Sequence, residues 1–103
     1  MITNPLLLYS PRLQISKSLG KIYLKAHQFT QAKWFFIQAN SLALAHKYID
    51  GQIQTSLLLA KTKIKAGDLS IARQDLAKAR RLIDGNHQIY VADLKQLSML
   101  VKN

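Results

Sequence analysis

The chain has 103 residues, 49% of them hydrophobic, which suits one domain with a single core. It contains no cysteine, so disulfides and thiolate metal sites are excluded. Fifteen lysines and arginines stand against five aspartates and no glutamate, for a formal charge of +10, and such a field favours acidic protein surfaces, nucleic acid or anionic lipid. No segment approaches the ~20 apolar residues of a membrane span. A chain without cysteine is compatible with a reducing compartment, and we expect a cytoplasmic protein.

The first start signal for a helix is Ser10 followed by Pro11, a capping hydroxyl and then proline at the first helical position. Residues 1–9 are therefore expected to form an N-terminal extension. The first helix carries a stripe at helical spacing that we expect to face the core. Its members are Ile15, Leu19, Ile22 and Ala26.

Four further helices are predicted from apolar spacing and turn signals. Their expected N-caps, in chain order for the second to fourth helices, are Thr30, Asp50 and Ser70. Gly67 is expected to adopt the left-handed conformation that follows a helix. The five expected helices span about residues 10–26, 30–48, 51–66, 71–83 and 87–102.

The chain repeats itself at an offset of 40 residues. Segment 27–32 aligns with segment 67–72, and Ala32, Phe36 and Ala39 are repeated by Ala72, Leu76 and Ala79. The pattern predicts an all-α fold: two antiparallel hairpins, 10–48 and 50–83, and a C-terminal capping helix, 87–102, within one domain, 10–103.

The first unit reads Leu19-Gly20-x2-Tyr23 and then Ala32-x3-Phe36, and it resembles the tetratricopeptide repeat (TPR). Small residues at Gly20 and Ala32 let two backbones approach, and the ring of Phe36 fills the space beside them. The departures are Ser16 where the pattern has Trp, Leu44 near the usual Pro, Lys63 in place of Tyr23 in the second unit, and a period of 40 rather than 34 residues. The resemblance implies a right-handed α-solenoid of five helices, similar to small co-chaperones of bacterial secretion systems and to the repeat domains of peptide-responsive regulators.

In such folds the first helix of each unit lines a concave groove. Here that helix carries lysines every four residues, and two of them recur at the 40-residue offset. Ammonium groups beside apolar residues suit an acidic or amphipathic segment of a partner protein, although a solvated helix face would show the same spacing. The expected groove residues are Lys17, Lys21, Leu24, Lys25, Leu57, Lys61, Ile64 and Lys65.

Two alternatives remain open. A second basic cluster on the fourth helix can contact phosphates of nucleic acid or of an anionic membrane. It consists of Arg73, Lys78, Arg80 and Arg81. Stable stacks of repeats usually need at least three units, so a structural, self-associating role or a heterocomplex is the other alternative. Trp34 or Phe35 is expected at an edge where a partner docks.

Signals of catalysis are missing. The aspartates fall mostly at predicted turns, and the three histidines, His27, His46 and His87, lie on separate elements without metal-ligand spacing and are expected to face solvent or to cap helices. No glycine belongs to a phosphate-binding motif. We therefore expect a non-catalytic protein without metal or cofactor.

Overall fold

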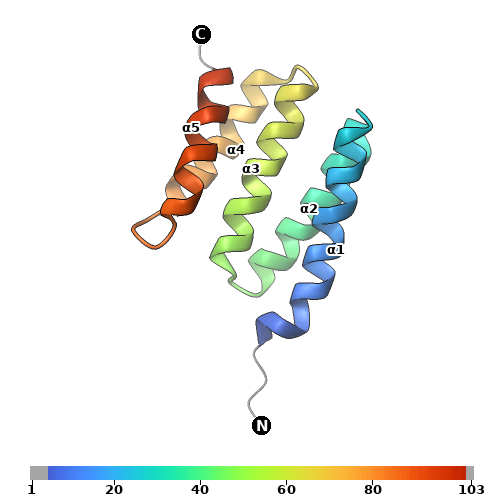
Figure 1. Cartoon of the computed structure of the whole chain (residues 1–103), viewed down its shortest axis with the longest axis vertical. Helices are drawn as coiled ribbons and strands as arrows, with labels where there is room; N and C mark the ends of the chain where they lie inside the picture. The colour runs from blue at the N-terminus through green and yellow to red at the C-terminus, as the bar shows by residue number, and fades with distance from the viewer. Residues whose placement is uncertain (1–4, 102–103) are drawn as a thin grey trace.

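The structure is a computed structural model that describes residues 5–101, with side chains from Pro11 onward. Over this range the fold is all-helical, as predicted, and contains no strand (Figure 1). Its elements are α1 (Pro5–Lys25), α2 (Phe29–Ala45), α3 (Ile49–Lys65), α4 (Leu69–Leu82), the 3-10 turn η1 (Gln88–Tyr90) and α5 (Val91–Leu100).

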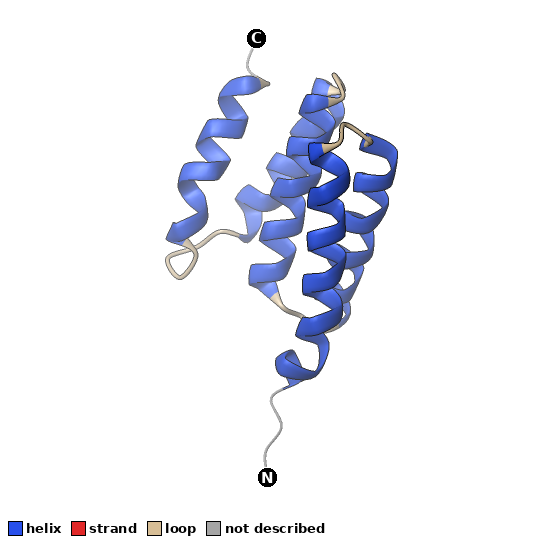
Figure 2. Cartoon of the chain, turned by 45° about the vertical axis from the view of Figure 1, so that its right-hand side comes forward, coloured by secondary structure: helices blue, strands red, loops and turns tan. Residues whose placement is uncertain are grey.

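Helices α1 and α2 form one antiparallel hairpin and α3 and α4 a second. Helix α2 packs on α3, which joins the two hairpins side by side into a small solenoid-like bundle. Helix α5 packs on both α3 and α4, and Figure 2 shows it standing beside the two hairpins. The molecule is flat, with extents of 52 × 32 × 18 Å, because two layers of helices at about 10 Å spacing make up its thickness.

The same backbone turn joins the first four helices. The helices after each turn begin at Phe29, Ile49 and Leu69, so the turn recurs every 20 residues. In each turn the middle residue has a left-handed φ: 61° at His27, 55° at Lys47 and 90° at Gly67. Backbone bonds close each turn in the same way, for example from Gln28 N–H to Tyr23 O at 2.9 Å. The sequence indicates this conformation only at Gly67, because the other two positions lack glycine.

A left-handed side chain carries a conformational cost that glycine avoids. Lys47 is exposed and its N–H bond to Leu44 O, 3.1 Å, is kept by any residue except proline. We expect Lys47→Gly to raise the free energy of unfolding by about 0.5–1 kcal/mol, after the added freedom of glycine in the unfolded chain is counted. Chemical denaturation monitored by circular dichroism measures the change.

Two glycines are the controls for that experiment. A Cβ at Gly67 or at Gly85 meets nothing within 4 Å, but only Gly67 has a left-handed φ. Gly67→Ala should therefore lower the stability by about 1 kcal/mol, whereas Gly85→Ala should leave it nearly unchanged. Equal effects of the two substitutions would contradict the conformational explanation.

The second helix of each hairpin faces the core as predicted. Ala32, Phe36 and Ala39 are fully buried, and their repeat equivalents are buried as well, with Leu76 at 2% exposure. Phe36 lies directly against Gly20 of α1: a Cβ at Gly20 would lie 2.6 Å from Cδ1 of the ring. The close approach of α1 and α2 expected from these residues is thus confirmed.

The start of the first helix was predicted wrongly. Helix α1 begins at Pro5, and Pro11 lies inside it, so the start signal at Ser10 and Pro11 fails and residues 5–9 of the expected extension are helical. Residues 1–4 lie outside the described range, as do residues 102 and 103, the first of which is the last residue of the expected capping helix. Figure 1 shows the first part of α1 bent away from the remainder, which is the usual effect of proline within a helix.

The face of α1 that packs was also predicted wrongly. Ile15 and Ile22 of the expected stripe are 59% and 62% exposed, and Ala26 is exposed as well. From Pro11 onward, the residues that α1 buries are Leu13, Lys17, Gly20 and Leu24. This set contains a lysine and a glycine, and it packs because Gly20 admits Phe36 and Leu24 joins the core beside it.

Each expected cap is the second residue of its helix, two positions after the observed N-cap. The observed N-caps are Gln28, Tyr48 and Asp68, and none of them makes a side-chain capping bond. The recurring turn closes each junction with backbone bonds, so Thr30, Asp50 and Ser70 are not used as caps. The negative charge of Asp50, in the first turn of α3, still stabilises the helix by interacting with the positive end of its dipole.

Candidate functional site

A groove of about 540 Å³ lies between α1, α3 and α5. Its walls come from helices that are far apart in the sequence, and its floor is formed mainly by α3. The lining residues are Lys17 and Lys21 of α1, Gln54, Leu57, Leu58, Lys61, Ile64 and Lys65 of α3, and Tyr90, Asp93, Gln96, Leu97 and Leu100 of η1 and α5.

Six of the eight residues predicted for the groove line it: Lys17, Lys21, Leu57, Lys61, Ile64 and Lys65. The other two do not. Leu24 is 6% exposed and packs in the core with Phe36 and Leu59, so its assignment to the groove is corrected. Lys25 is exposed but is not among the lining residues. The reason is the orientation of α1, which turns Leu24 toward α2 once Gly20 packs on Phe36.

The groove combines positive charge with apolar surface. Four lysines line it against a single carboxylate, that of Asp93. Five leucines and isoleucines lie between these charges, and Leu57, only 6% exposed, belongs to the core as well as to the floor. Such a surface attracts anionic groups and also gains free energy by burying apolar ones.

Lys17 is the buried member of the lysine set. Its residue exposure is 8%, and its ammonium donates to Gln54 Oε1 of α3. Burial lowers the pKa of the Lys17 ammonium below its usual value, and the nearby charge of Lys21 lowers that pKa further. Lys17 lines the groove, as predicted from its spacing with Lys21 and Lys25, but its side chain also lies on the packed face of α1.

The repeat equivalent of Lys17 is Leu57, which is buried without a charge. We expect Lys17→Leu to raise the free energy of unfolding by about 1 kcal/mol at pH 7, because it removes a desolvated charge while filling the same space. The amide oxygen of Gln54 then faces the groove, where solvent can reach it.

The sign of the pH dependence follows from the lowered pKa of Lys17. Between that pKa and 10.5 the unfolded chain holds a proton that the folded chain has released, so the stability of the wild type rises with pH. The advantage of Lys17→Leu should therefore shrink as pH increases across this window. Urea denaturation of both proteins at several pH values between 7 and 10.5 checks this, and a constant difference would contradict the assignment.

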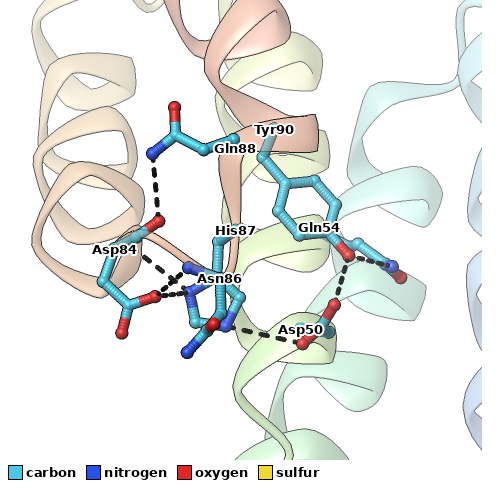
Figure 3. A network of polar contacts seen from close by, with 7 residues as sticks. All are labelled: Asp50, Gln54, Asp84, Asn86, His87, Gln88 and Tyr90. Carbon is cyan, nitrogen blue, oxygen red and sulfur yellow. Dashed lines mark hydrogen bonds and ion pairs between the residues drawn. The ribbon is translucent and has the colours of Figure 1, made fainter.

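A polar network holds the α5 side of the groove in place (Figure 3). Gln54 Nε2 donates to Tyr90 Oη at 2.8 Å, and Tyr90 Oη donates to Asp50 Oδ2 at 2.8 Å. Burial raises the pKa of the Tyr90 phenol; the hydrogen bond from Gln54 opposes this, and the Asp50 carboxylate adds to it. The network thereby links α3 to η1, and through Gln54 it extends to Lys17 of α1.

His87 extends the network to the loop after α4. Its Nε2 lies 3.6 Å from Asp50 Oδ1 and its Nδ1 lies 2.9 Å from Asp84 Oδ1. His87 is the N-cap residue of η1, as the capping expectation allows, but its ring is buried rather than facing solvent. This network could not be predicted from the sequence, because its longest links join residues 36 to 40 positions apart. No local spacing relates these residues.

In the basic cluster of α4, two of the four residues form hydrogen bonds to the C-terminal end of α5. Arg73 donates to Val101 O from Nε at 3.2 Å and from Nη2 at 2.7 Å, and Arg80 Nη2 donates to Ser98 Oγ at 3.2 Å. These two arginines therefore tie α4 to the end of α5. All four residues of the cluster are exposed.

Fold and groove together define a class of protein: a small all-α bundle of stacked hairpins with a basic, partly apolar groove. Among residues 5–101, no group of three or more His, Cys, Asp or Glu is placed to hold a metal ion, and no helix is both long and apolar enough to cross a bilayer. Comparisons of the chain with protein-family models, with curated proteins and with solved structures give no match.

Proposed function

We propose that this chain is a non-catalytic, TPR-like interaction module of the cytoplasm that binds an acidic, amphipathic segment of a partner protein. The observation that carries the proposal is the set of four lysines around the apolar floor of the groove. Peptide-binding grooves of this kind take apolar side chains on their floor and fix charged ones at their rims.

The dimensions of the groove favour inserted side chains over a whole buried domain. A volume of about 540 Å³ is in the range of sites that hold one small ligand or a few side chains. Leu57, Leu58 and Leu97 offer the apolar contacts; the four lysines belong to α1 and α3, whereas the carboxylate of Asp93 belongs to α5. We infer that the carboxylates of the bound segment face α1 and α3.

Two features support the TPR-like part of the proposal. Gly20 and Phe36, two of the residues that carry the resemblance, are in direct contact. The helices that line the groove are also the first helices of the two hairpins, α1 and α3, followed by α5, which is the placement that the resemblance predicts.

A charge-reversal pair tests the groove. Lys21 and Lys61 are exposed groove residues, so Lys21→Glu/Lys61→Glu should fold normally, as circular dichroism can verify. The tagged protein should capture a dominant protein partner from nuclease-treated lysate of its source cells at physiological salt. The double variant should lose that partner, because two attractive contacts become repulsive.

The matched control is Lys78→Glu/Arg81→Glu, which changes the net charge equally on two exposed residues of α4. The control should keep the partner. If the control loses it while the groove variant keeps it, the groove proposal fails. Recovery that disappears with nuclease would favour the nucleic-acid alternative, in which the exposed basic residues of α4 contact phosphates.

A further inference from the structure

The outer face of α1 is apolar and uncovered. Ile15 and Ile22 are seven residues apart, on one face of the helix, and are 59% and 62% exposed, with Leu19 partly exposed between them. This face lies opposite the buried residues Leu13 and Leu24, and it is separate from the groove, which α1 lines with Lys17 and Lys21.

The 40-residue repeat gives this face an internal counterpart. Ile15, Leu19 and Ile22 correspond to the α3 residues Thr55, Leu59 and Thr62. Those three are 0%, 7% and 0% exposed. Helix α2 covers this face of α3: Asn40 Nδ2 donates to Thr55 Oγ1 at 2.7 Å, and Leu59 packs with Phe36. The geometry that accepts a helix on α3 is thus present on α1.

The buried face of α3 carries polar threonines and the exposed face of α1 carries apolar isoleucines, which is the reverse of the usual relation between polarity and burial. The covered face of α3 carries threonines, whose hydroxyls bond to backbone carbonyls of their own helix: Thr55 to Gly51 O and Thr62 to Leu58 O, each at 2.8 Å. The uncovered face of α1 carries isoleucines at the same positions. Large apolar side chains on an exposed helix-packing face mark an interaction surface.

Aromatic rings extend this surface onto α2. Tyr23, one helical turn after Leu19, stacks on Phe35 with ring centroids 5.5 Å apart, and Phe35 meets the ring of Trp34 edge-on at 5.0 Å. Trp34 is 56% exposed, as expected for an edge where a partner docks. In the second unit the residues at these three positions are Lys63, Asp75 and Gln74, so the aromatic row is confined to the first hairpin.

Charge identifies the kind of partner. Residues 1–49 contain no aspartate or glutamate, and all five aspartates lie at residue 50 or later. Arg12 and Lys25, both exposed, lie three residues before Ile15 and three residues after Ile22, and so adjoin the apolar stripe. A second copy would bring its own charge of +10 to this basic surface, whereas a helix with acidic flanks would be attracted.

We propose that Ile15, Leu19 and Ile22, with the adjoining ring of Trp34, form a second docking surface that takes an acidic amphipathic helix of a partner protein. The bound helix lies on α1 as α2 lies on α3. Its apolar stripe covers the isoleucines, and its carboxylates pair with Arg12 and Lys25. The surface is independent of the groove, so one chain can hold two segments.

Trp34 is the only tryptophan of the chain and reports on this surface directly. The probe is a synthetic 18-residue peptide with leucines at i, i+4, i+7 and i+11 and glutamates on both flanks, compared with a scrambled peptide of the same composition. Titration should shift the emission of Trp34. The variant Ile15→Thr/Ile22→Thr, which imposes the residues of α3, should weaken binding about tenfold or more while its thermal unfolding stays unchanged.

Controls separate this surface from other sites. Ile71→Thr/Met99→Thr changes two exposed apolar residues of α4 and α5 and should leave binding intact. Undiminished binding by Ile15→Thr/Ile22→Thr, or loss of binding only in Lys21→Glu/Lys61→Glu, would overturn the proposal, because the peptide would then lie elsewhere or in the groove. Equal binding of the scrambled peptide would overturn it as well.

Two further measurements examine the other possible occupants. Sedimentation velocity should show a monomer whose mass does not depend on Ile15 and Ile22; association that the double threonine variant abolishes would assign the surface to a second copy. Vesicles of phosphatidylcholine with phosphatidylserine should not shift Trp34 emission, and a shift lost in the same variant would assign it to an anionic membrane. Either result would overturn the proposal.

Discussion

Gly20→Ala is expected to lower the free energy of unfolding by about 2 kcal/mol, although alanine is the better helix former by about 1 kcal/mol. A Cβ on residue 20 would lie 2.6 Å from Cδ1 and 2.9 Å from Cζ of Phe36, and closer still to Cε1. The ring cannot move aside easily, because Phe36 of α2 is fully buried against Leu24 of α1 and Leu59 of α3. The two helices of the first hairpin must therefore separate or the ring must leave its preferred rotamer.

The second hairpin supplies the compensating change. At the positions of Gly20 and Phe36 it has Ala60 and Leu76, a larger residue on the first helix and a smaller one on the second, both within one core cluster. We expect Gly20→Ala/Phe36→Leu to be more stable than the sum of the two single variants by at least 1 kcal/mol. Urea denaturation of the four proteins in this cycle measures the coupling. Additive effects would mean that Gly20 is not required by the ring.

The hairpins were predictable because local signals agree with the packing. Ala32, Phe36 and Ala39 form one face of α2 at helical spacing, and the same spacing recurs in α4, so core face and repeat follow from the sequence alone. The left-handed residue of the recurring turn was predicted only at Gly67, where the residue is a glycine. His27 and Lys47 adopt the same φ without glycine, because the backbone bonds that close the turn do not depend on the side chain.

The orientation of α1 was not predictable from composition. Its more apolar stripe, with Ile15 and Ile22, is exposed, while the packed stripe contains Lys17 and Gly20. A periodicity argument assigns the more apolar face to the core, and it fails here because contact with Phe36 decides which way α1 turns. The start of α1 was also mispredicted. Pro11 lies inside the helix, and a proline inside a helix gives the same local sequence signal as a proline at the first helical position.

The lysines of the groove could be predicted, but its second wall could not. Lys21, Lys61 and Lys65 follow from spacing along α1 and α3. The other wall depends on where α5 docks, and that is fixed by contacts between distant residues, such as Tyr90 with Asp50 and Arg73 with Val101. No local pattern encodes those contacts.

The second large effect on stability is expected at one pair of positions that is occupied by different residues in the two hairpins. Tyr23 and Phe35 of the first hairpin stack with centroids 5.5 Å apart. Their repeat equivalents, Lys63 and Asp75, form an ion pair with Nζ and Oδ2 2.7 Å apart and side-chain exposures of 19% and 12%. One position pair is therefore filled by two rings in one hairpin and by two opposite charges in the other. The sequence did not reveal this ion pair, because Lys63 stood out only as a departure from the repeat pattern.

Lys63→Ala should lower the free energy of unfolding by about 2–3 kcal/mol, because it leaves the mostly buried carboxylate of Asp75 without its cation. Lys63→Tyr/Asp75→Phe, which transplants the aromatic pair of the first hairpin, should restore the stability to within about 1 kcal/mol of the wild type, since rings of this kind fill the same position pair in the same kind of hairpin.

Thermal and urea denaturation of the two variants, with Lys61→Ala as the control, decides the matter. Lys61 is an exposed lysine two residues away on the same helix, and its removal should change the stability by less than about 0.5 kcal/mol. If the transplanted pair is as unstable as Lys63→Ala, the two hairpins are not interchangeable at this position, and the 40-residue repeat is a match of helix spacing without a match of packing. Recovery would establish that each hairpin uses the same contact between its two helices, once through rings and once through charges.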